Sequence, residues 1–196
     1  MGFGVENGGG IRQAQASTST STTQTINVTV NQVITLSLSG ANLNLPTLTP
    51  GTAVIATSSA TVTTNAVSGW QLQVNRNSAT STIASGTITF PDQTAFTGNN
   101  ATSAANLANS GANLSFREYQ TGTSAGDYSS ATWGTADTDP SAFYAGFPTS
   151  AVTYASTSTY TGTAQTVVME VRANAPATQQ ATTYTGAITI TAVALP

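Results

Sequence analysis

The chain has 196 residues, a net charge of −3 and neither His nor Cys, so it is long enough to bury the core of one domain. The missing side chains exclude Ser-His-Asp and Cys-His catalysis and disulfide bonds, and scattered arginines on an acidic chain do not provide the basic stripe that nucleic acid requires. Charged residues make up only 6% of the chain and Thr about a fifth, which is typical of extended structure with a polar surface.

Residues 1–24 are predicted to form a flexible N-terminal arm. They combine Gly8-Gly9-Gly10 with the Ser/Thr run at 17–23. Ala14-Gln15-Ala16 is similar to the small-x-small end of a signal peptide, but no apolar segment precedes it. The Ser/Thr richness and the absence of Lys favour an extracellular or cell-surface location. No run of 18 apolar residues predicts a membrane span.

Residues 25–39 show the strongest pattern in the chain. Apolar residues recur at even positions, with Thr, Asn or Ser on most odd ones, and only Gln32 and Val33 break the phase. Period-two alternation predicts a β-strand with one apolar face, more than twice the usual length. Because a flexible arm precedes it, this strand is a candidate donor that leaves its own domain and pairs with another copy. Its apolar face consists of Ile26, Val28, Val30, Ile34, Leu36 and Leu38.

The rest of the chain predicts an all-β fold in a single domain, residues 25–196. Short alternating segments lie between Gly, Pro and Asn turns, as in an antiparallel β-sandwich of immunoglobulin-like or jelly-roll type. Trp70 is expected in the core, and Ala101 to Ala108 are expected to form one or two helical turns. The further predicted strands are residues 54–64, 70–74, 83–90, 114–119, 151–155, 166–173 and 184–194.

Residues 120–149 interrupt this pattern and predict a long loop insertion rich in aromatic residues. Long loops in compact domains are usually functional or disordered. Two interpretations remain open: the aromatic side chains form an exposed platform for a subunit contact or for stacking on sugars, or the loop folds back and they cap the sandwich. The residues concerned are Tyr128, Trp133, Phe143, Tyr144 and Phe147.

The sequence also contains candidate ligands for Ca²⁺ and candidate glycosylation sites. Asp127, Asp137 and Asp139, together with Glu118, are weak candidates for a Ca²⁺ site, because Ca²⁺ prefers oxygen ligands; the alternative is that the aspartates stabilise turns. No metal or other cofactor is predicted beyond this. Candidate glycosylation sequons begin at Asn27, Asn100 and Asn113.

Two segments resemble known surface proteins. Gly69-Trp70-Gln71-Leu72-Gln73-Val74 resembles the first Trp-x-Leu motif of WxL-type surface proteins, and the stretch from Thr183 to Thr191 is similar to the last strand of those domains. The second Trp of that family is absent, with Ile188 or Ile190 at its place, so peptidoglycan binding is not implied. The opening strand and the order of elements resemble the secreted β-sandwich subunits of TasA-like and archaeal bundling-pilus filaments. The resemblance covers roughly residues 25–90 and 165–196 and implies polymerisation by strand donation.

The favoured hypothesis is therefore a structural subunit of an extracellular filament or surface layer, a homopolymer joined non-covalently by β-strand addition. The alternative is a monomeric cell-surface adhesin or carbohydrate-binding module that uses the aromatic insertion to bind glycans. We do not expect an enzyme, because the seven acidic residues provide few facing pairs for general acid-base chemistry.

Overall fold

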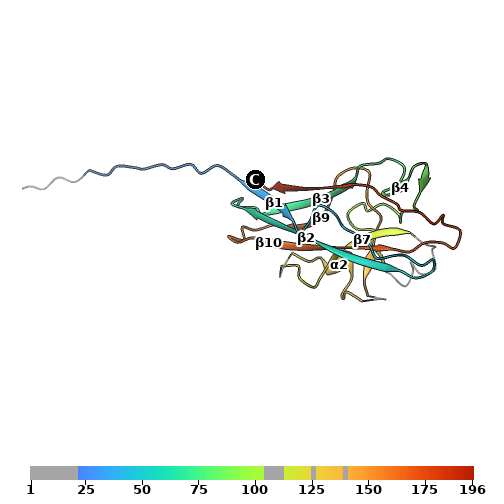
Figure 1. Ribbon diagram of the computed structural model, residues 1–196. Coiled ribbons are helices and arrows are strands. Elements are labelled where there is room, and N and C mark those ends of the chain that lie inside the picture. Colours follow the sequence, from blue (N-terminus) through green and yellow to red (C-terminus); the bar gives the residue numbers. More distant parts are fainter. Residues whose placement is uncertain (1–21, 104–112, 125–126, 139–140) are drawn as a thin grey trace, which may run out of the picture. The chain divides into compact units, whose positions relative to one another are not determined.

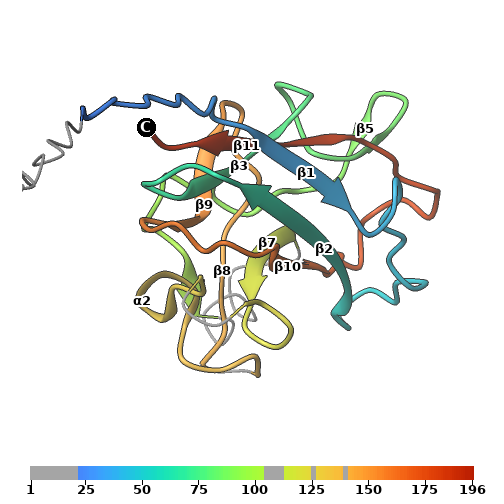
Figure 2. The same ribbon diagram turned by 90° about the vertical axis from the view of Figure 1, so that its left-hand side faces the viewer.

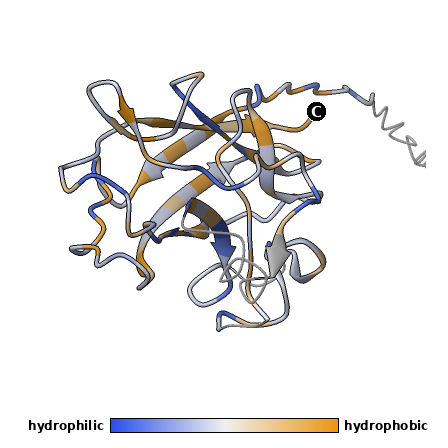
Figure 3. Cartoon of the chain, turned by 90° about the vertical axis from the view of Figure 1, so that its right-hand side faces the viewer, coloured by the Kyte–Doolittle hydropathy of each residue, from blue (hydrophilic) through white to orange (hydrophobic). Residues whose placement is uncertain are grey.

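The computed structural model describes residues 22–103, 113–124, 127–138 and 141–196, and these residues are nearly all β. The chain divides into two compact units, residues 1–31 and residues 32–196. Apolar and polar residues alternate along the strands of the larger unit (Figure 3), as the period of the sequence predicts. The all-β prediction is confirmed.

The larger unit is a sandwich of two antiparallel sheets, seen as two layers in Figure 1. The first sheet has the order β1-β2-β10-β7, and the second has the order β11-β3-β9. The first comprises β1 (Ile34–Leu38), β2 (Val54–Thr64), β10 (Gln165–Ala173) and β7 (Leu114–Tyr119). The second comprises β11 (Ile188–Ala194), β3 (Trp70–Arg76) and β9 (Val152–Thr157).

Short elements outside the two sheets refine the predicted boundaries. The predicted strand at 83–90 is a tight hairpin of β4 (Ala84–Ser85) and β5 (Ile88–Thr89). The segment expected to be helical begins with β6 (Thr102–Ser103), which pairs with β8 (Phe143–Tyr144), and its residues 104–108 lie outside the described part of the chain. A four-residue helix, α2 (Ser130–Trp133), lies in the insertion.

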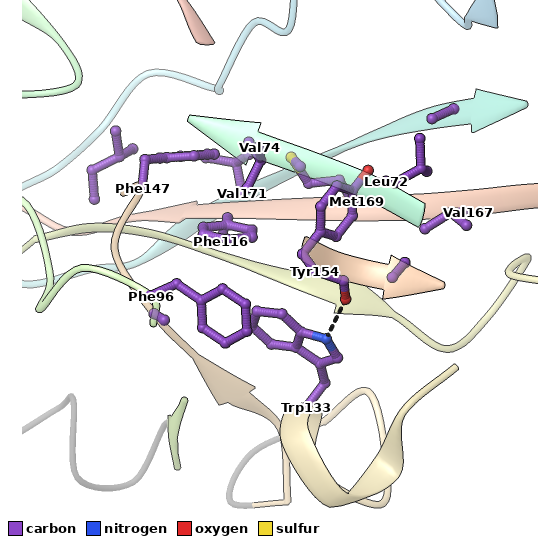
Figure 4. Packing of buried hydrophobic residues seen from close by; sticks show 14 of the residues in the cluster. Leu72, Val74, Phe96, Phe116, Trp133, Phe147, Tyr154, Val167, Met169 and Val171 are labelled. Atoms are coloured by element: carbon purple, nitrogen blue, oxygen red, sulfur yellow. Dashed lines mark hydrogen bonds between the residues drawn. The ribbon is translucent and has the colours of Figure 1, made fainter. Parts of the chain in front are cut away.

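The core lies between the two sheets (Figure 4). The second sheet contributes Trp70, Leu72 and Val74, and all three are fully buried. From the first sheet, Val167 and Met169 of β10 face them with 0% and 2% of their surface exposed. Each of these side chains contributes about 1.5–3 kcal/mol through burial, so the alternating strands are held mainly by this layer.

The insertion covers the outer face of the β10–β7 pair, which makes this pair buried on both faces. Arg117 of β7 lies opposite Glu170 of β10, and both point away from the core yet are almost fully buried. Tyr144 of β8 donates a hydrogen bond of 2.5 Å from its hydroxyl to Glu170 Oε1. The guanidinium groups of Arg117 and Arg172 both lie over the Tyr144 ring. The outward face of this sheet therefore carries a polar layer sealed by the insertion.

Gly69 fixes the approach of the chain into β3. Its φ is +82°, and a Cβ atom at this position would lie 2.3 Å from the carbonyl oxygen of Thr157 on β9. Gly51 has nearly the same φ, +84°, but no heavy atom lies within 4 Å of the corresponding point. Both glycines therefore need a positive φ, but only at Gly69 would an added Cβ atom clash with the backbone of β9.

We expect Gly69→Ala to lower the free energy of unfolding by more than 3 kcal/mol, because Ala must both adopt positive φ and displace the backbone of β9. Gly51→Ala serves as the control, with a loss of about 1–2 kcal/mol from the backbone conformation alone. Urea denaturation of both variants measures the difference. Equal losses would show that the approach to Thr157 is not tight.

Candidate functional site

The predicted donor strand is divided in the structure, and its two parts have different environments. Ile34, Leu36 and Leu38 belong to β1, which pairs antiparallel with β2 of the same domain. In the smaller unit, Ile26, Val28 and Val30 lie in an extended segment outside any strand and are 82%, 80% and 77% exposed. The prediction of one continuous strand over residues 25–39 is therefore wrong, and the part available for donation ends before β1.

The division has a local cause at Gln32 and Val33. The carbonyl of Val33 accepts hydrogen bonds from Asn65 N and from Thr64 Oγ1, at 3.3 and 2.7 Å. The Val33 amide donates to Asn65 Oδ1 at 2.7 Å. Strand β2 ends at Thr64, so these are the last hydrogen bonds of the β1–β2 ladder. The ladder thus ends where Gln32 and Val33 interrupt the alternation of the sequence. Among the described residues, no strand continues β2 in this register.

Among the described residues, three edge strands of the sandwich have no strand on their second side, namely β1, β11 and β9, and two of them, β1 and β11, meet on one side of the domain. In the described part of the chain, no strand pairs with the second edge of β1 or of β11. Gln32 Nε2 donates a hydrogen bond of 2.8 Å to the carbonyl of Leu195, just after β11. Figure 2 shows β1 and β11 close together near this point and diverging from it. Between them, the inward side chains of Ile34, Leu36, Ile188, Ile190 and Ala192 are only half-buried.

The opposite edge of the first sheet is closed. The amide of Leu114 at the start of β7 donates to Pro91 O, and its carbonyl accepts from Gln93 N. Phe116 exchanges two backbone hydrogen bonds with Ala145, at 2.8 and 3.0 Å. These segments use the backbone groups of β7 that an incoming strand would need.

The aromatic residues of the insertion are mostly buried. Trp133, Tyr144 and Phe147 are 0%, 3% and 2% exposed, whereas Tyr128 and Phe143 are half-buried. Trp133 packs on Phe96 with 4.6 Å between ring centroids, and its Nε1 donates to the carbonyl of Tyr154 at 3.0 Å (Figure 4). Trp133, Tyr144 and Phe147 are therefore not available as an exposed platform; they are in the capping arrangement that was the second interpretation.

The described members of the predicted Ca²⁺ group, Glu118, Asp127 and Asp137, do not form a cluster that could hold a metal ion. Asp137 forms an ion pair with the fully buried Arg117 and also accepts hydrogen bonds from the amides of Gln120 and Thr121. Asp139 lies outside the described residues. Within the described ranges, no group of three or more acidic, His or Cys side chains is placed to hold a metal ion. Asp137 stabilises the turn after β7, as the alternative interpretation of these aspartates states.

A pair of buried carboxyl groups, Glu118 and Asp127, lies near the end of β7; both are among the weak Ca²⁺ candidates of the sequence analysis, which does not predict their burial. Glu118 is fully buried, and its Oε2 accepts a hydrogen bond of 3.4 Å from the Ser129 amide. Asp127 is 5% exposed and lines a cavity of about 230 Å³ with Ser129 and Tyr154. Glu118 Oε1, Asp127 Oδ2 and the Tyr154 hydroxyl have no hydrogen-bond partner among the described residues.

Burial shifts the protonation of both carboxyl groups. It raises the pKa of Glu118 to about 8, with the Asp127 charge adding to the effect and the Ser129 hydrogen bond and the Arg117 charge opposing it. Burial also raises the pKa of Asp127 to about 6. In Asp137 burial acts in the same direction, but the hydrogen bonds from Thr121 and Gln120 and the Arg117 charge outweigh it and lower the pKa. The Glu118–Asp127 pair thus holds protons at pH values where an exposed carboxyl group does not.

The three glycosylation sequons differ in accessibility. Asn27 is exposed, whereas Asn113 is 7% exposed and donates from Nδ2 to Gln93 Oε1 at 3.0 Å. Asn100 uses both ends of its side chain, since Oδ1 accepts from Thr97 N and Nδ2 donates to Ala95 O. Asn27 is the sequon that the fold leaves open to modification.

Comparisons with protein-family models, with curated proteins and with solved structures find no match to this chain. Among the described residues, no helix has the length and apolar character needed to cross a bilayer.

We expect the free energy of unfolding to fall as the pH rises from 4.5 to 8. In this window folded Glu118 keeps a proton that the unfolded chain has lost, so ionisation favours unfolding, by a total on the order of 4 kcal/mol. Chemical denaturation across this pH range measures the slope, and Glu118→Gln should flatten it. Asp127→Asn is the matched control, because it should remove only the lower part of the fall, between pH 3.8 and 6. A slope that Glu118→Gln leaves unchanged would contradict the assignment.

We expect Asp137→Ala to destabilise the protein by about 3–5 kcal/mol, because it leaves the buried Arg117 without its ion-pair partner. Asp92→Ala is the comparison, since Asp92 pairs with Arg76 where both side chains are partly exposed, at 11% and 13%. Thermal and urea denaturation of the two variants give the measurement. A larger loss for Asp92→Ala would show that burial does not decide the strength of these pairs.

Proposed function

We propose that this protein is a structural subunit of an extracellular filament or surface layer, and that copies join non-covalently by addition of the arm strand to a neighbouring sandwich. The observation that supports this is the exposure of Ile26, Val28 and Val30 on alternate positions of an extended segment. A segment with one apolar face and no partner strand gains stability when another sheet edge receives it.

The composition of this segment agrees with strand addition. Thr25, Asn27 and Thr29 are exposed and polar, and residues 22–33 contain no charged side chain and no Pro. Charge and Pro are the features by which proteins usually prevent edge pairing, and both are missing. The segment has the apolar, uncharged character of an interior strand.

Energetics set a condition on the site that receives the strand. Burial of three branched side chains contributes about 5–9 kcal/mol. Ordering the five residues 26–30 costs about 5–10 kcal/mol in backbone entropy. These two terms nearly cancel, so the backbone hydrogen bonds, at about 0.5–1.5 kcal/mol each, decide whether the strand binds. The receiving site must therefore offer a free row of amides and carbonyls.

The other described features fit a structural role better than ligand recognition. Three of the five aromatic side chains of the insertion are buried, which favours a structural role over a carbohydrate platform. The buried Arg117–Asp137 pair and the Tyr144–Glu170 hydrogen bond stabilise the sandwich. The cell-surface location is part of the same proposal and is supported by the composition alone.

The arm has a polar and an apolar face that can be altered separately. The triple variant Ile26→Asp, Val28→Asp and Val30→Asp should abolish assembly, because strand addition would bury three charges. The matched control, Thr25→Asp, Asn27→Asp and Thr29→Asp, adds the same charge on the other face and should keep at least part of the assembly. Light scattering with size-exclusion chromatography and negative-stain microscopy at high protein concentration measure both.

Two outcomes would contradict the proposal. One is a wild-type protein that stays monomeric at every concentration tested. The other is equal assembly of the two triple variants, which would show that the apolar face of the arm has no part in the contact.

A further inference from the structure

We propose that the free edge of β11 is the acceptor, and that it receives residues 26–30 of a second copy as a fourth strand of the β11-β3-β9 sheet. This inference rests on the proposed function and names the surface that strand addition uses. Three features support it: the unused backbone groups of β11, the half-buried side chains beside that edge, and the exposed arm that can cover them.

The register of β11 shows which of its backbone groups are unused. Leu195 N donates to Gly69 O, and Asn77 N donates to Ala187 O, so the odd-numbered residues of this segment face β3. In an antiparallel pair the intervening residues point their amide and carbonyl groups to the other side. The backbone groups of Ile188, Ile190 and Ala192 therefore point to the free edge.

The same three residues direct their side chains toward the core and remain half-buried. Inward side chains of the neighbouring β3, such as Leu72 and Val74, are fully buried. The difference arises because β11 has a strand on one side only. A strand added at this edge would cover the open side of the core, opposite Ile34 and Leu36 of β1.

The arm fits this edge in length, pattern and charge. Its apolar residues Ile26, Val28 and Val30 span five positions, and β11 offers seven, from Ile188 to Ala194. Both segments alternate apolar with uncharged residues, so no buried charge opposes the pairing. The second sheet has three strands against four in the first, and an added strand makes the two sheets equal.

The strand that pairs with the free edge of β11 comes from another copy, because hydrogen bonds already hold the residues just after the arm in place. Val33 is bonded to Asn65, and Gln32 reaches Leu195 at the end of β11. An arm folding back along its own β11 would have to reverse direction between Val30 and Gln32. Only Asn31 lies between them, and one residue is shorter than the two-residue loop of the tightest common hairpin.

The test uses the full-length chain and removes one free-edge amide from β11 and one from β1, the two open strands that lie beside the half-buried side chains. Ala192→Pro removes an amide that points away from β3, so the fold keeps its ladder. Leu38→Pro is the matched control on β1, where Ser39 N donates to Ser59 O and the register turns the Leu38 amide to the free edge. We expect Ala192→Pro to raise the concentration needed for assembly at least tenfold, while Leu38→Pro leaves it within about twofold.

Amide hydrogen exchange on the wild-type protein gives a second measurement that does not depend on the folding of a variant. On assembly, exchange at Ile188, Ile190 and Ala192 should slow at least tenfold, while the already paired Thr189 and Thr191 change little. Slow exchange at these three amides in the isolated monomer would show that the chain's own arm occupies the edge, and would overturn the proposal.

The outcomes separate this inference from the proposed function. Assembly that is lost with Leu38→Pro and kept with Ala192→Pro would place the acceptor at β1 and overturn the assignment of β11, while strand addition itself stands. Assembly that responds to neither substitution overturns the edge assignment as well. A wild-type chain that never assembles overturns both.

Discussion

The β10–β7 pair, buried on both faces, is the constraint on which the rest of the sandwich depends. Its inner face carries Met169 and Phe116 into the core, and its outer face carries Glu170 and Arg117 under the insertion. A buried charge is stable only when it is paired and hydrogen-bonded, so the insertion must supply Asp137 and Tyr144 at the correct places. The long insertion is thus a third layer of the fold, and its aromatic residues serve that layer.

This arrangement explains which features the sequence could predict. The alternation of apolar and polar residues was enough to predict β2, β3 and β10 and to place Trp70 in the core. The reason is that the residue types of such a strand alternate with the buried and exposed sides of its sheet. The same rule failed at residues 25–39, where the alternation continues while the partner strand ends at Thr64. A segment forms a β-strand only where a neighbouring strand pairs with it, and the length of that neighbour is determined by a different part of the sequence.

The candidate sites show a second limit of sequence reasoning. Glu118 has the phase of an inward residue, yet its pairing with Asp127 depends on how the insertion returns over the end of β7. Asp137, a weak Ca²⁺ candidate for which a role in a turn is the alternative, pairs with Arg117, a side chain 20 positions away. Long-range contacts of this kind depend on loop paths, for which the sequence has no periodic signal. The exposure of Ile26, Val28 and Val30 likewise follows from the start of β1 at Ile34, which the alternation of the sequence does not predict.

The closed edge of β7 has a consequence for the geometry of any polymer. With that side sealed by the backbone of Pro91, Gln93 and Ala145, β1 and β11 present their open edges together on one flank of the sandwich, while β9 is the edge strand at the other side of the second sheet. If the arm is donated to the β1–β11 flank, as we propose, neighbouring copies form a head-to-tail contact, which does not close on itself unless the rotation between them brings the last copy back to the first. Such a chain is unbranched and directional: one terminus presents an unused ribbon and the other an empty flank, so a short peptide copy of residues 22–33 would block growth at one terminus only.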